Sequence, residues 1–490
     1  MHYFIKVFCF AIFIGQVSQA SKLITIDQDQ NRTTIIITSP VDFHGFAEAH
    51  ERGIKGHNQT IAFIENTPTL NHPQFQENQI TLFDVSHRAN YYGQDISTWR
   101  RSKEDEETES RFNLDWILDN HNIQDHYHGN HVIGIAVGQP GLYNYVLNDN
   151  TDKKKNDIKL SFKGGCSPLA RVINYDYSNF YPKQEWNWLD NPIKKHFPTG
   201  VCVYTYEDLY TKIELSGYTK IAEDIYRLKE AKKVKYEEIN DLISLRKETK
   251  NKIDAMSENE RNFYKETKID DSLMQAFRAF FKSEARILNA SLQLMPLCDP
   301  LNSYKIPSYI VEEIAEGLEK NDKILVLAAN NECINLSSSL KFNYFKDFFY
   351  HSSLKDRSLI AINIVPYEDE FFCKNLGTVL LKDQTVLNIG LGNQSNYPGS
   401  DLKEFALCAL GKTISGSESL DNKCQNLFSV GNGTSMAAPV ISSLCALMAE
   451  KYPHFNGKEI VSRIKETAIK FGNPDYTGCG FLYAPSSLGL

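Results

Sequence analysis

The chain has 490 residues, of which 42% are hydrophobic and 23% are charged, as in ordinary soluble globular proteins. This length exceeds one small core and suits a large α/β domain that contains an insertion. The net charge is -8 and the Lys-rich stretches are short or mixed with Glu, so the sequence lacks the basic face that a nucleic-acid partner requires.

Residues 1–20, MHYFIKVFCFAIFIGQVSQA, have the features of a secretory signal peptide. Lys6 provides a positive charge, residues 7–14 form an apolar run, and residues 18–20 are suited to cleavage. The apolar run is too short to act as a membrane anchor, and no later segment approaches spanning length. We therefore expect a secreted or periplasmic protein with no membrane span.

The cysteine pattern indicates thiols or disulfides rather than a metal site. Removal of the signal peptide leaves nine of the ten cysteines, so at least one thiol is free or pairs between chains. There is no CxxC spacing, which argues against zinc. Cys333 and Cys445 lie in apolar or strand-like contexts and are predicted to be core residues. Cys408 and Cys424 flank a loop, and a disulfide between them is one alternative.

From about residue 42, short apolar strands alternate with helical stretches, which predicts a parallel sheet covered by helices. The predicted strands are 61–64, 80–83, 170–175, 287–291, 324–328 and 359–364, and the predicted helices are 128–137, 310–319 and 436–451. The first of these strands leads directly into Glu65. A carboxylate at the mouth of a buried strand is costly to desolvate. We expect that it either reaches water or meets a partner from a distant segment.

The segment from Tyr206 to Lys282 interrupts this alternation, because it is charged and contains no proline. Its apolar residues recur at helical spacing, which predicts one or two long amphipathic helices inserted into the α/β domain. We favour a solvated helical hairpin that packs on the domain. An arm that forms a coiled coil or binds a protein partner is the alternative.

Ser435 follows a Gly-rich turn and precedes an apolar helix in SVGNGTSMAAPVISSLCALMAEKYP, residues 429–453. A serine at this position is either an N-cap or a nucleophile, since the helix dipole and free backbone N–H groups favour negative charge beside it. A second candidate segment, HGNHVIGIAVG (128–138), places His128 and His131 at the start of another helix.

Several segments together resemble one protein family. GTSMAAP resembles the nucleophile motif of the subtilisin-like serine proteases, and HGNHVIGIAVG resembles their His-Gly-Thr-His-Val-Ala-Gly block. IAFIENTPTLNHPQF (61–75) is similar in register to their Val-Ala-Val-Ile-Asp-Ser-Gly block. GCSPLARVINY, ILNASLQL and ILVLAANNE look like further blocks of the fold. The similarity covers residues 42–490 apart from the helical insertion.

The resemblance implies a three-layer α/β fold with a mostly parallel central sheet and helices on both faces. It also implies a serine endopeptidase that acts on protein or peptide substrates. Ser435 falls at the position of the nucleophile and His128 at that of the general base, whereas His131 is structural. Glu65 takes the place of the catalytic aspartate, and Asn331 that of the oxyanion-hole asparagine. The cleft would be lined by 291–293, where Gln293 replaces a glycine, and by 329–331.

The sequence departs from the family pattern at Glu65, at Asn130 in place of Thr, and at Asn330 in place of Gly. Glutamate can orient a histidine, although its extra methylene moves the carboxylate by about 1.5 Å. Asp84 and Asp125 are weaker candidates for the same acid. A pseudoprotease that binds through the cleft or the helical insertion is the alternative to an active enzyme.

The predicted organisation is a signal peptide (1–20), a subtilisin-like peptidase domain (21–490) and a helical insertion within it (206–282). Only residues 21–39 precede the region that resembles the mature enzymes, so we expect folding without a prodomain. No cofactor is predicted; calcium is common in the family, but no ligands can be assigned. A protein partner at the helical insertion is an open possibility, and no nucleic-acid partner is expected.

Overall fold

The computed structural model describes residues 21–28, 31–65, 68, 72–77, 79–84, 124–145, 159–176, 271–292, 294, 306, 308–339, 342–367, 372–417 and 427–490. The predicted signal peptide, residues 206–270 of the predicted insertion, Gln293 and Cys424 lie outside these ranges. Within the described residues, no helix has the length and apolar character needed to cross a membrane.

The main sheet consists of β3 (Thr60–Glu65), β4 (Ile80–Asp84), β7 (Arg171–Asp176), β8 (Ile287–Ala290), β9 (Ile324–Ala328), β10 (Ser358–Pro366), β11 (Phe372–Leu380), β12 (Val386–Gly392) and β13 (Ala406–Leu410). Its strand order is β11-β12-β10-β9-β8-β3-β7-β4, and β13 also pairs with β10. All pairs from β4 to β10 and the β10–β13 pair are parallel, whereas β10–β12 and β11–β12 are antiparallel.

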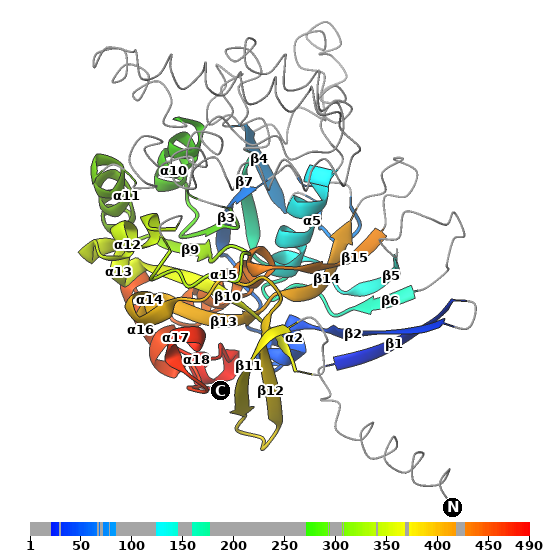
Figure 1. Cartoon of the computed structure of the whole chain (residues 1–490). Helices are drawn as coiled ribbons and strands as arrows, with labels where there is room; N and C mark the ends of the chain where they lie inside the picture. Colours follow the sequence, from blue (N-terminus) through cyan, green and yellow to red (C-terminus); the bar gives the residue numbers. More distant parts are fainter. Residues whose placement is uncertain are drawn as a thin grey trace, which may run out of the picture.

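Smaller strands and the helices surround this sheet (Figure 1). A second sheet has the order β14-β15-β5-β6, from β5 (Gly141–Tyr145), β6 (Lys159–Phe162), β14 (Lys412–Ser417) and β15 (Leu427–Asn432). A separate antiparallel hairpin joins β1 (Ser21–Gln28) and β2 (Asn31–Thr38). The longer helices are α5 (Gln124–Val137), α10 (Asp271–Lys282), α11 (Ser308–Lys320), α15 (Thr434–Lys451) and α16 (Gly457–Thr467). The shorter ones are α2 (Pro40–Phe43), α3 (Phe46–Glu51), α12 (Tyr344–Phe349), α13 (Ser352–Arg357), α14 (Gly399–Leu402), η3 (Lys403–Phe405), α17 (Pro474–Thr477) and α18 (Ala484–Leu488).

The central strands are buried on both faces, and each face packs against a layer of helices. In β9, Leu325 and Leu327 belong to one core cluster, whereas Ile324 and Val326 belong to the other. This alternation follows from the two-residue period of a strand. The first cluster includes α10, α11 and α12, and the second includes α5, α15 and α16. The chain therefore has the three-layer α/β architecture that the sequence predicts.

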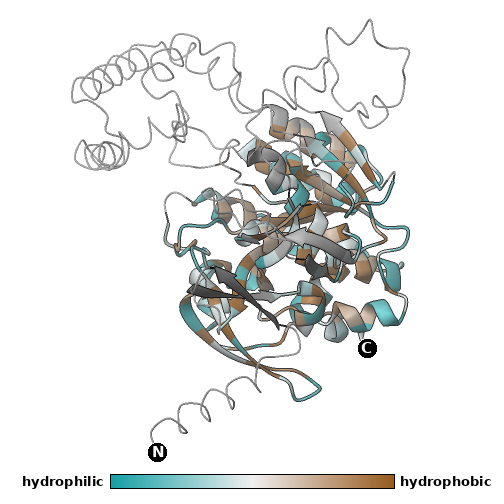
Figure 2. Cartoon of the chain, turned by 90° about the vertical axis from the view of Figure 1, so that its right-hand side faces the viewer, coloured by the Kyte–Doolittle hydropathy of each residue, from teal (hydrophilic) through white to brown (hydrophobic). Residues whose placement is uncertain are grey.

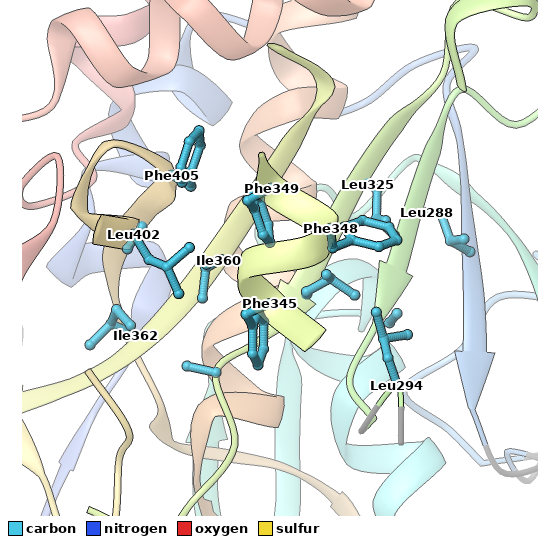
Figure 3. Close-up of a cluster of buried hydrophobic side chains, with 14 of the residues drawn as sticks. Leu288, Leu294, Leu325, Phe345, Phe348, Phe349, Ile360, Ile362, Leu402 and Phe405 are labelled. Atoms are coloured by element: carbon cyan, nitrogen blue, oxygen red, sulfur yellow. The ribbon is translucent and has the colours of Figure 1, made fainter. Parts of the chain in front are cut away.

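Aromatic side chains of α12 cover one face of the sheet. Phe345, Phe348 and Phe349 are all buried, and Figure 3 shows them between the sheet and a neighbouring turn. Their neighbours in that view are Leu288, Leu294, Leu325, Ile360, Ile362, Leu402 and Phe405. Large aromatic side chains remove much apolar area from water, so this short helix is an effective cover for β8, β9 and β10.

On the opposite face, α15 is the central helix of the fold. Every residue from Met436 to Ala449 is buried. A helix that is apolar on all sides belongs in the interior of a domain. Figure 2 shows the apolar colouring concentrated in the middle of the described body and the hydrophilic colouring mainly in its outer segments. The first turn of α15 is therefore fixed by packing along the rest of the helix.

The six predicted strands and the three helices predicted outside the insertion are present, most of them with shifted ends. The bounds of the predicted insertion stay a prediction, because residues 206–270 lie outside the described residues. Residues 271–282 form α10, and the buried side chains of Leu273, Phe277 and Phe280 place this helix in the layer over the main sheet. The other domain boundaries stay predictions.

The structure also tests the predictions for two cysteines. Cys445 is buried in α15, as predicted, but the prediction for Cys333 is wrong. Because β9 ends at Ala328, Cys333 lies in the following loop, where it is exposed. Cys408 is a free thiol buried in β13, and its Sγ donates to the carbonyl of Thr477 at 3.3 Å.

Candidate active site

Three elements carry Glu65, His128 and Ser435 to one face of the main sheet. Side chains alternate along β3, so Glu65 lies on the same face as Ile61 and Phe63. That face is covered by α5, which carries His128, and by α15, which carries Ser435 as its second residue. The two helices pack against each other. The structure thus brings Glu65 and His128 into contact, whereas Ser435 lies at the first turn of the neighbouring helix and its hydroxyl binds the carbonyl of Ser291.

Glu65 and His128 form a direct pair. Nδ1 of the imidazole lies 2.8 Å from Oε1 of the carboxylate. The Glu65 side chain is 1% exposed, whereas the His128 side chain is 31% exposed. A buried carboxylate next to Nδ1 accepts a hydrogen bond from its N–H group and fixes the neutral tautomer. The ring therefore presents Nε2 on its more open side as the proton acceptor.

Buried polar contacts hold the helix that carries this histidine. The Gln74 side chain donates from Nε2 to the carbonyl of Asn130 at 3.0 Å, and its Oε1 accepts from the hydroxyl of Ser415 at 3.2 Å. Gly134 lets these groups approach, because a Cβ there would lie 2.4 Å from Oε1 of Gln74 and 2.2 Å from Oγ of Ser415. Asn130, the residue that replaces the family's threonine, is itself buried.

His131 is a buried residue of the same helix. Its Nε2 lies 3.4 Å from Oγ1 of Thr413, and its side chain is removed from water. Burial lowers the pKa of His131 to about 3, with the nearby His128 acting in the same direction. The ring is therefore neutral at physiological pH and serves as a structural group, as the sequence predicts.

Ser435 lies at the first turn of α15, where Pro439 changes the helical hydrogen bonding. In a regular helix the N–H of residue 439 would donate to the carbonyl of residue 435, but proline has no N–H. Instead, Oγ of Ser291 donates to that carbonyl at 2.8 Å. Oγ of Ser435 in turn donates to the carbonyl of Ser291 at 3.2 Å. The segment after β8 and the first turn of α15 are thus joined twice.

A buried polar network extends behind this contact. Nδ2 of Asn289 donates to Oγ of Ser291 at 2.8 Å, and Oγ of Ser442 donates to Oδ1 of Asn289 at 2.9 Å. All three side chains are buried. Buried polar groups of this kind are expensive to leave unpaired, so the network fixes a single arrangement. It sets the position of β8 relative to the helix that carries Ser435.

Asn331 lies beside the same turn. Its Oδ1 accepts from the backbone N–H of Thr434 at 2.8 Å and from the hydroxyl of Thr434 at 3.2 Å. With the amide oxygen occupied in this way, Nδ2 is the group left to act as a donor. A side-chain donor therefore stands next to Ser435, although Asn331 itself is exposed.

The loop that carries Asn331 is shaped by two other asparagines. Asn330 has a φ of 70°, a left-handed conformation that asparagine tolerates better than most residues, and Nδ2 donates to the hydroxyl of Tyr344 at 3.0 Å. Asn396 is buried and accepts from the N–H groups of Glu332 and Ile334 at 2.9 and 3.0 Å. Its Nδ2 donates to the carbonyl of residue 329 at 2.8 Å. The Asn396 side chain therefore binds backbone groups on both sides of Asn331.

The alternative acids are placed only by their backbones. Asp84 is the last residue of β4, and β7 lies between β4 and β3. The backbone of Asp84 is therefore two strands away from that of Glu65. Asp125 lies in the first turn of α5, and its side chain is outside the described residues. Glu65 is the carboxylate that the structure places on Nδ1 of His128.

Sequence reasoning missed Gln74 and Asn396. Gln74 follows a His-Pro pair, and Asn396 lies in the turn-rich run GNQSNYPG, so both could be assigned to loops. Nothing in either pattern tells which distant backbone groups the amide would bind. For a metal, the described part of the chain has no group of three or more His, Cys, Asp or Glu side chains suited to binding.

The family model that matches the chain is that of the Subtilase family, over residues 225–481. This range is more than half of the chain and includes Asn331 and Ser435, whereas Glu65 and His128 precede it. A curated relative, the thermostable alkaline protease of Halalkalibacterium halodurans, is 38% identical over 53 residues. This match covers 11% of the chain and 15% of that relative's length.

Solved structures with a similar fold include the MycP3 protease from the type VII (ESX-3) secretion system, at 15% identity and a TM-score of 0.45. The match covers 92% of this chain and 88% of that one. The PatG macrocyclase domain has 14% identity and a TM-score of 0.47, with 92% and 97% covered. Fervidolysin from Fervidobacterium pennivorans has 12% identity and a TM-score of 0.44, with 92% and 45% covered.

Proposed function

The chain belongs to the subtilase family, and on this premise we propose that it is a secreted serine endopeptidase whose acyl-enzyme forms on Ser435. The observation that carries the proposal is the 2.8 Å contact between Nδ1 of His128 and the buried carboxylate of Glu65. A histidine oriented by a carboxylate is the general base that a serine nucleophile requires.

In the proposed reaction, Oγ of Ser435 attacks the scissile carbonyl while Nε2 of His128 takes its proton. The hydroxyl must first turn away from the carbonyl of Ser291, to which it donates at rest. The carboxylate of Glu65, which accepts the hydrogen bond from Nδ1, stabilises the imidazolium. The imidazolium then protonates the leaving amine, and a water molecule activated by the same base hydrolyses the acyl-enzyme.

The developing oxyanion needs hydrogen-bond donors that are already in place. Nδ2 of Asn331 and the backbone N–H of Ser435 fit this role, because Oδ1 of Asn331 is already bound to Thr434. In a related protease, a subtilisin, loss of such an asparagine costs about 2.7–4 kcal/mol of transition-state stabilisation; that figure comes from the relative and not from this chain.

Glutamate in place of aspartate is the main reason to consider a pseudoprotease. The longer side chain displaces the carboxylate by about 1.5 Å unless the backbone compensates, and a misplacement of about 1 Å can slow a reaction by a factor of about a hundred. Here the contact length of 2.8 Å is that of a normal charge-assisted hydrogen bond. This geometry favours the enzyme over the scaffold.

A fluorophosphonate probe tests the proposal, because it reacts with an activated serine and not with an ordinary one. We expect covalent labelling of Ser435 that disappears in Ser435→Ala. A matched control is Ser462→Ala, which removes an exposed hydroxyl of α16 and should leave labelling unchanged. Absence of labelling in correctly folded protein would favour the scaffold.

Export and substrate class complete the proposal. The segment 1–20 would direct secretion or periplasmic export and be removed after Ala20, which N-terminal sequencing of the secreted protein can check. Protein or peptide substrates follow from the chemistry proposed for the family, and the predicted insertion, residues 206–282, is the region proposed to bind a protein partner.

A further inference from the structure

Two cysteines outside the proposed catalytic group lie close to the loop that carries Asn331. Cys333 follows β9 in this loop, and Cys373 is the second residue of β11. Both are exposed. The other described cysteines, which are all buried, are Cys166, Cys408, Cys445 and Cys479. The exposed pair is therefore the one that an oxidant in solution can reach.

Both cysteines are anchored at the end of β12. The N–H of Cys333 donates to the carbonyl of Gln394 at 2.8 Å, and Sγ of Cys373 contacts the carbonyl of Gly392 at 3.6 Å. The two thiols also contact each other. Burial and the neighbouring Tyr476 raise the pKa of the Tyr397 hydroxyl, and both thiols act on this pKa in the same direction. Neighbouring thiols whose residues are bound to backbone groups two positions apart, at Gly392 and Gln394, are candidates for a disulfide.

The backbone at Cys333 is fixed independently of its thiol. Cys333 has a φ of 56°, and the flanking N–H groups of Glu332 and Ile334 both bind the buried side chain of Asn396. The direction of the Cys333 side chain is therefore set by the loop itself.

We propose that Cys333 and Cys373 form a disulfide that ties the Asn331 loop to the β11–β12 hairpin. The disulfide forms by thiol–disulfide exchange with an external disulfide, either glutathione disulfide or a protein oxidant of the exported compartment. The effect on the Asn331 loop rests on the proposed protease function, whereas the cross-link itself does not.

The exchange balances in two steps. A thiolate at one cysteine attacks the oxidant, forms a mixed disulfide and releases one thiol. The second thiolate then displaces the remaining half of the oxidant. The protein loses two S–H bonds and gains one disulfide, while the oxidant loses its disulfide and gains two S–H bonds. Although Cys373 is an exposed residue, its sulfur is partly desolvated, and this desolvation together with contact with the Cys333 thiol raises the pKa of Cys373 to about 12. We therefore expect the first attack to come from Cys333.

Peptide mapping tests the cross-link directly. The full chain is equilibrated with glutathione disulfide, alkylated under native conditions, and digested without reduction at acidic pH. We expect a cross-linked peptide pair that contains Cys333 and Cys373 and that separates on reduction. The buried thiols of Cys166 and Cys445 serve as internal controls that stay unalkylated until unfolding. Recovery of Cys333 and Cys373 as separately alkylated peptides would overturn the proposal.

A second arm tests the effect on the loop. Dithiothreitol should slow fluorophosphonate labelling of Ser435 several-fold in the wild type, and should leave the rate of Cys373→Ser unchanged. Reduction should also lower the Tm by about 5 °C, since a closed loop of this length restricts the unfolded chain. A mapped cross-link whose reduction leaves both labelling and Tm unchanged would overturn the loop-holding role. If no serine is labelled in any form, the protease proposal fails while the mapping still decides the cross-link.

Discussion

Oε1 of Glu65 lies 2.8 Å from Nδ1 of His128, although glutamate is one methylene longer than the aspartate usual in the family. The carboxylate is almost fully buried, and β3 delivers it to the face that α5 and α15 cover. The additional length is therefore accommodated by the end of the strand. The pair keeps the contact that tautomer control requires.

Two substitutions of Glu65 separate the effect of the carboxylate's position from the effect of its negative charge. Glu65→Asp should slow fluorophosphonate inactivation by about ten- to a hundredfold, because the carboxylate withdraws from Nδ1. Glu65→Gln should slow it by about a thousand- to ten-thousandfold, because the amide does not stabilise an imidazolium. Second-order inactivation rates measure both effects, with thermal unfolding as the control for folding. A Gln variant as fast as wild type would show that Glu65 has no role in the reaction.

The hydroxyl of Ser291 should matter because Pro439 leaves the carbonyl of Ser435 without a helical donor. We expect Ser291→Ala to lower the free energy of unfolding by about 1–2 kcal/mol, since a buried carbonyl loses its partner. In a Pro439→Ala background the restored N–H can donate to the same carbonyl, and the cost should shrink by about 1 kcal/mol. A double-mutant cycle in urea measures this coupling. Strictly additive costs would contradict the assignment.

Asn396 should act as a positioning residue for the Asn331 loop. Replacing it by alanine removes the partners of one buried carbonyl and two N–H groups, so Asn396→Ala should lower the free energy of unfolding by about 2–4 kcal/mol. Turnover should fall more than substrate affinity, because the oxyanion donor is displaced. Asn388→Ala, on the exposed face of the β11–β12 hairpin, is the matched control and should change neither quantity. Equal kcat values for Asn396→Ala and wild type would contradict this role.

Stability should fall in mild acid because of His44. Its Nδ1 donates to the carbonyl of Leu482 at 2.6 Å, and Nε2 accepts from the N–H of Leu410 at 2.9 Å, so a second ring proton would face a donor. Burial lowers the pKa of His44 to about 4. The unfolded chain binds this proton at an ordinary pKa near 6.5, so the stabilisation is complete above that pH and is lost as the pH falls towards 4.

The loss over this window should reach about 3 kcal/mol for His44 alone. Urea unfolding between pH 4 and 7 measures it, and the non-titrating variant His44→Asn should show a shallower slope. The buried His131 has a similarly lowered pKa and accounts for part of the remaining slope. An identical pH slope in wild type and His44→Asn would rule out this explanation.

Short-range patterns predicted six of the nine strands of the main sheet, and they missed β11, β12 and β13. The buried run before Glu65 and the apolar helix after Ser435 have periods and lengths that local physics dictates. The second sheet was missed because the pairing of its strands depends on distant partners; β15 pairs with both β14 and β5. Likewise, the end of the predicted insertion could not be placed from the sequence. An amphipathic helix such as α10 has the same spacing of apolar residues whether it packs on the domain core or belongs to a projecting arm.

The site shows the same division. The two motifs that contain His128 and Ser435 predict the base and the nucleophile, and the register of the strand before Glu65 predicts the acid. The structure places Glu65 in contact with His128. The supporting amides of Gln74 and Asn396 were not predictable, because each binds backbone groups far away in the sequence. The exposure of Cys333 was misjudged for a related reason: apolar neighbours in sequence do not reveal where a strand ends.

An experimental structure of the fluorophosphonate adduct tests the convergence of Glu65, His128 and Ser435 most directly. We expect phosphorus bonded to Oγ of Ser435, a phosphoryl oxygen within about 3 Å of Nδ2 of Asn331, and the Glu65 carboxylate still bound to Nδ1 of His128. A probe attached to another residue, or a Glu65 carboxylate turned away from the imidazole, would contradict this expectation.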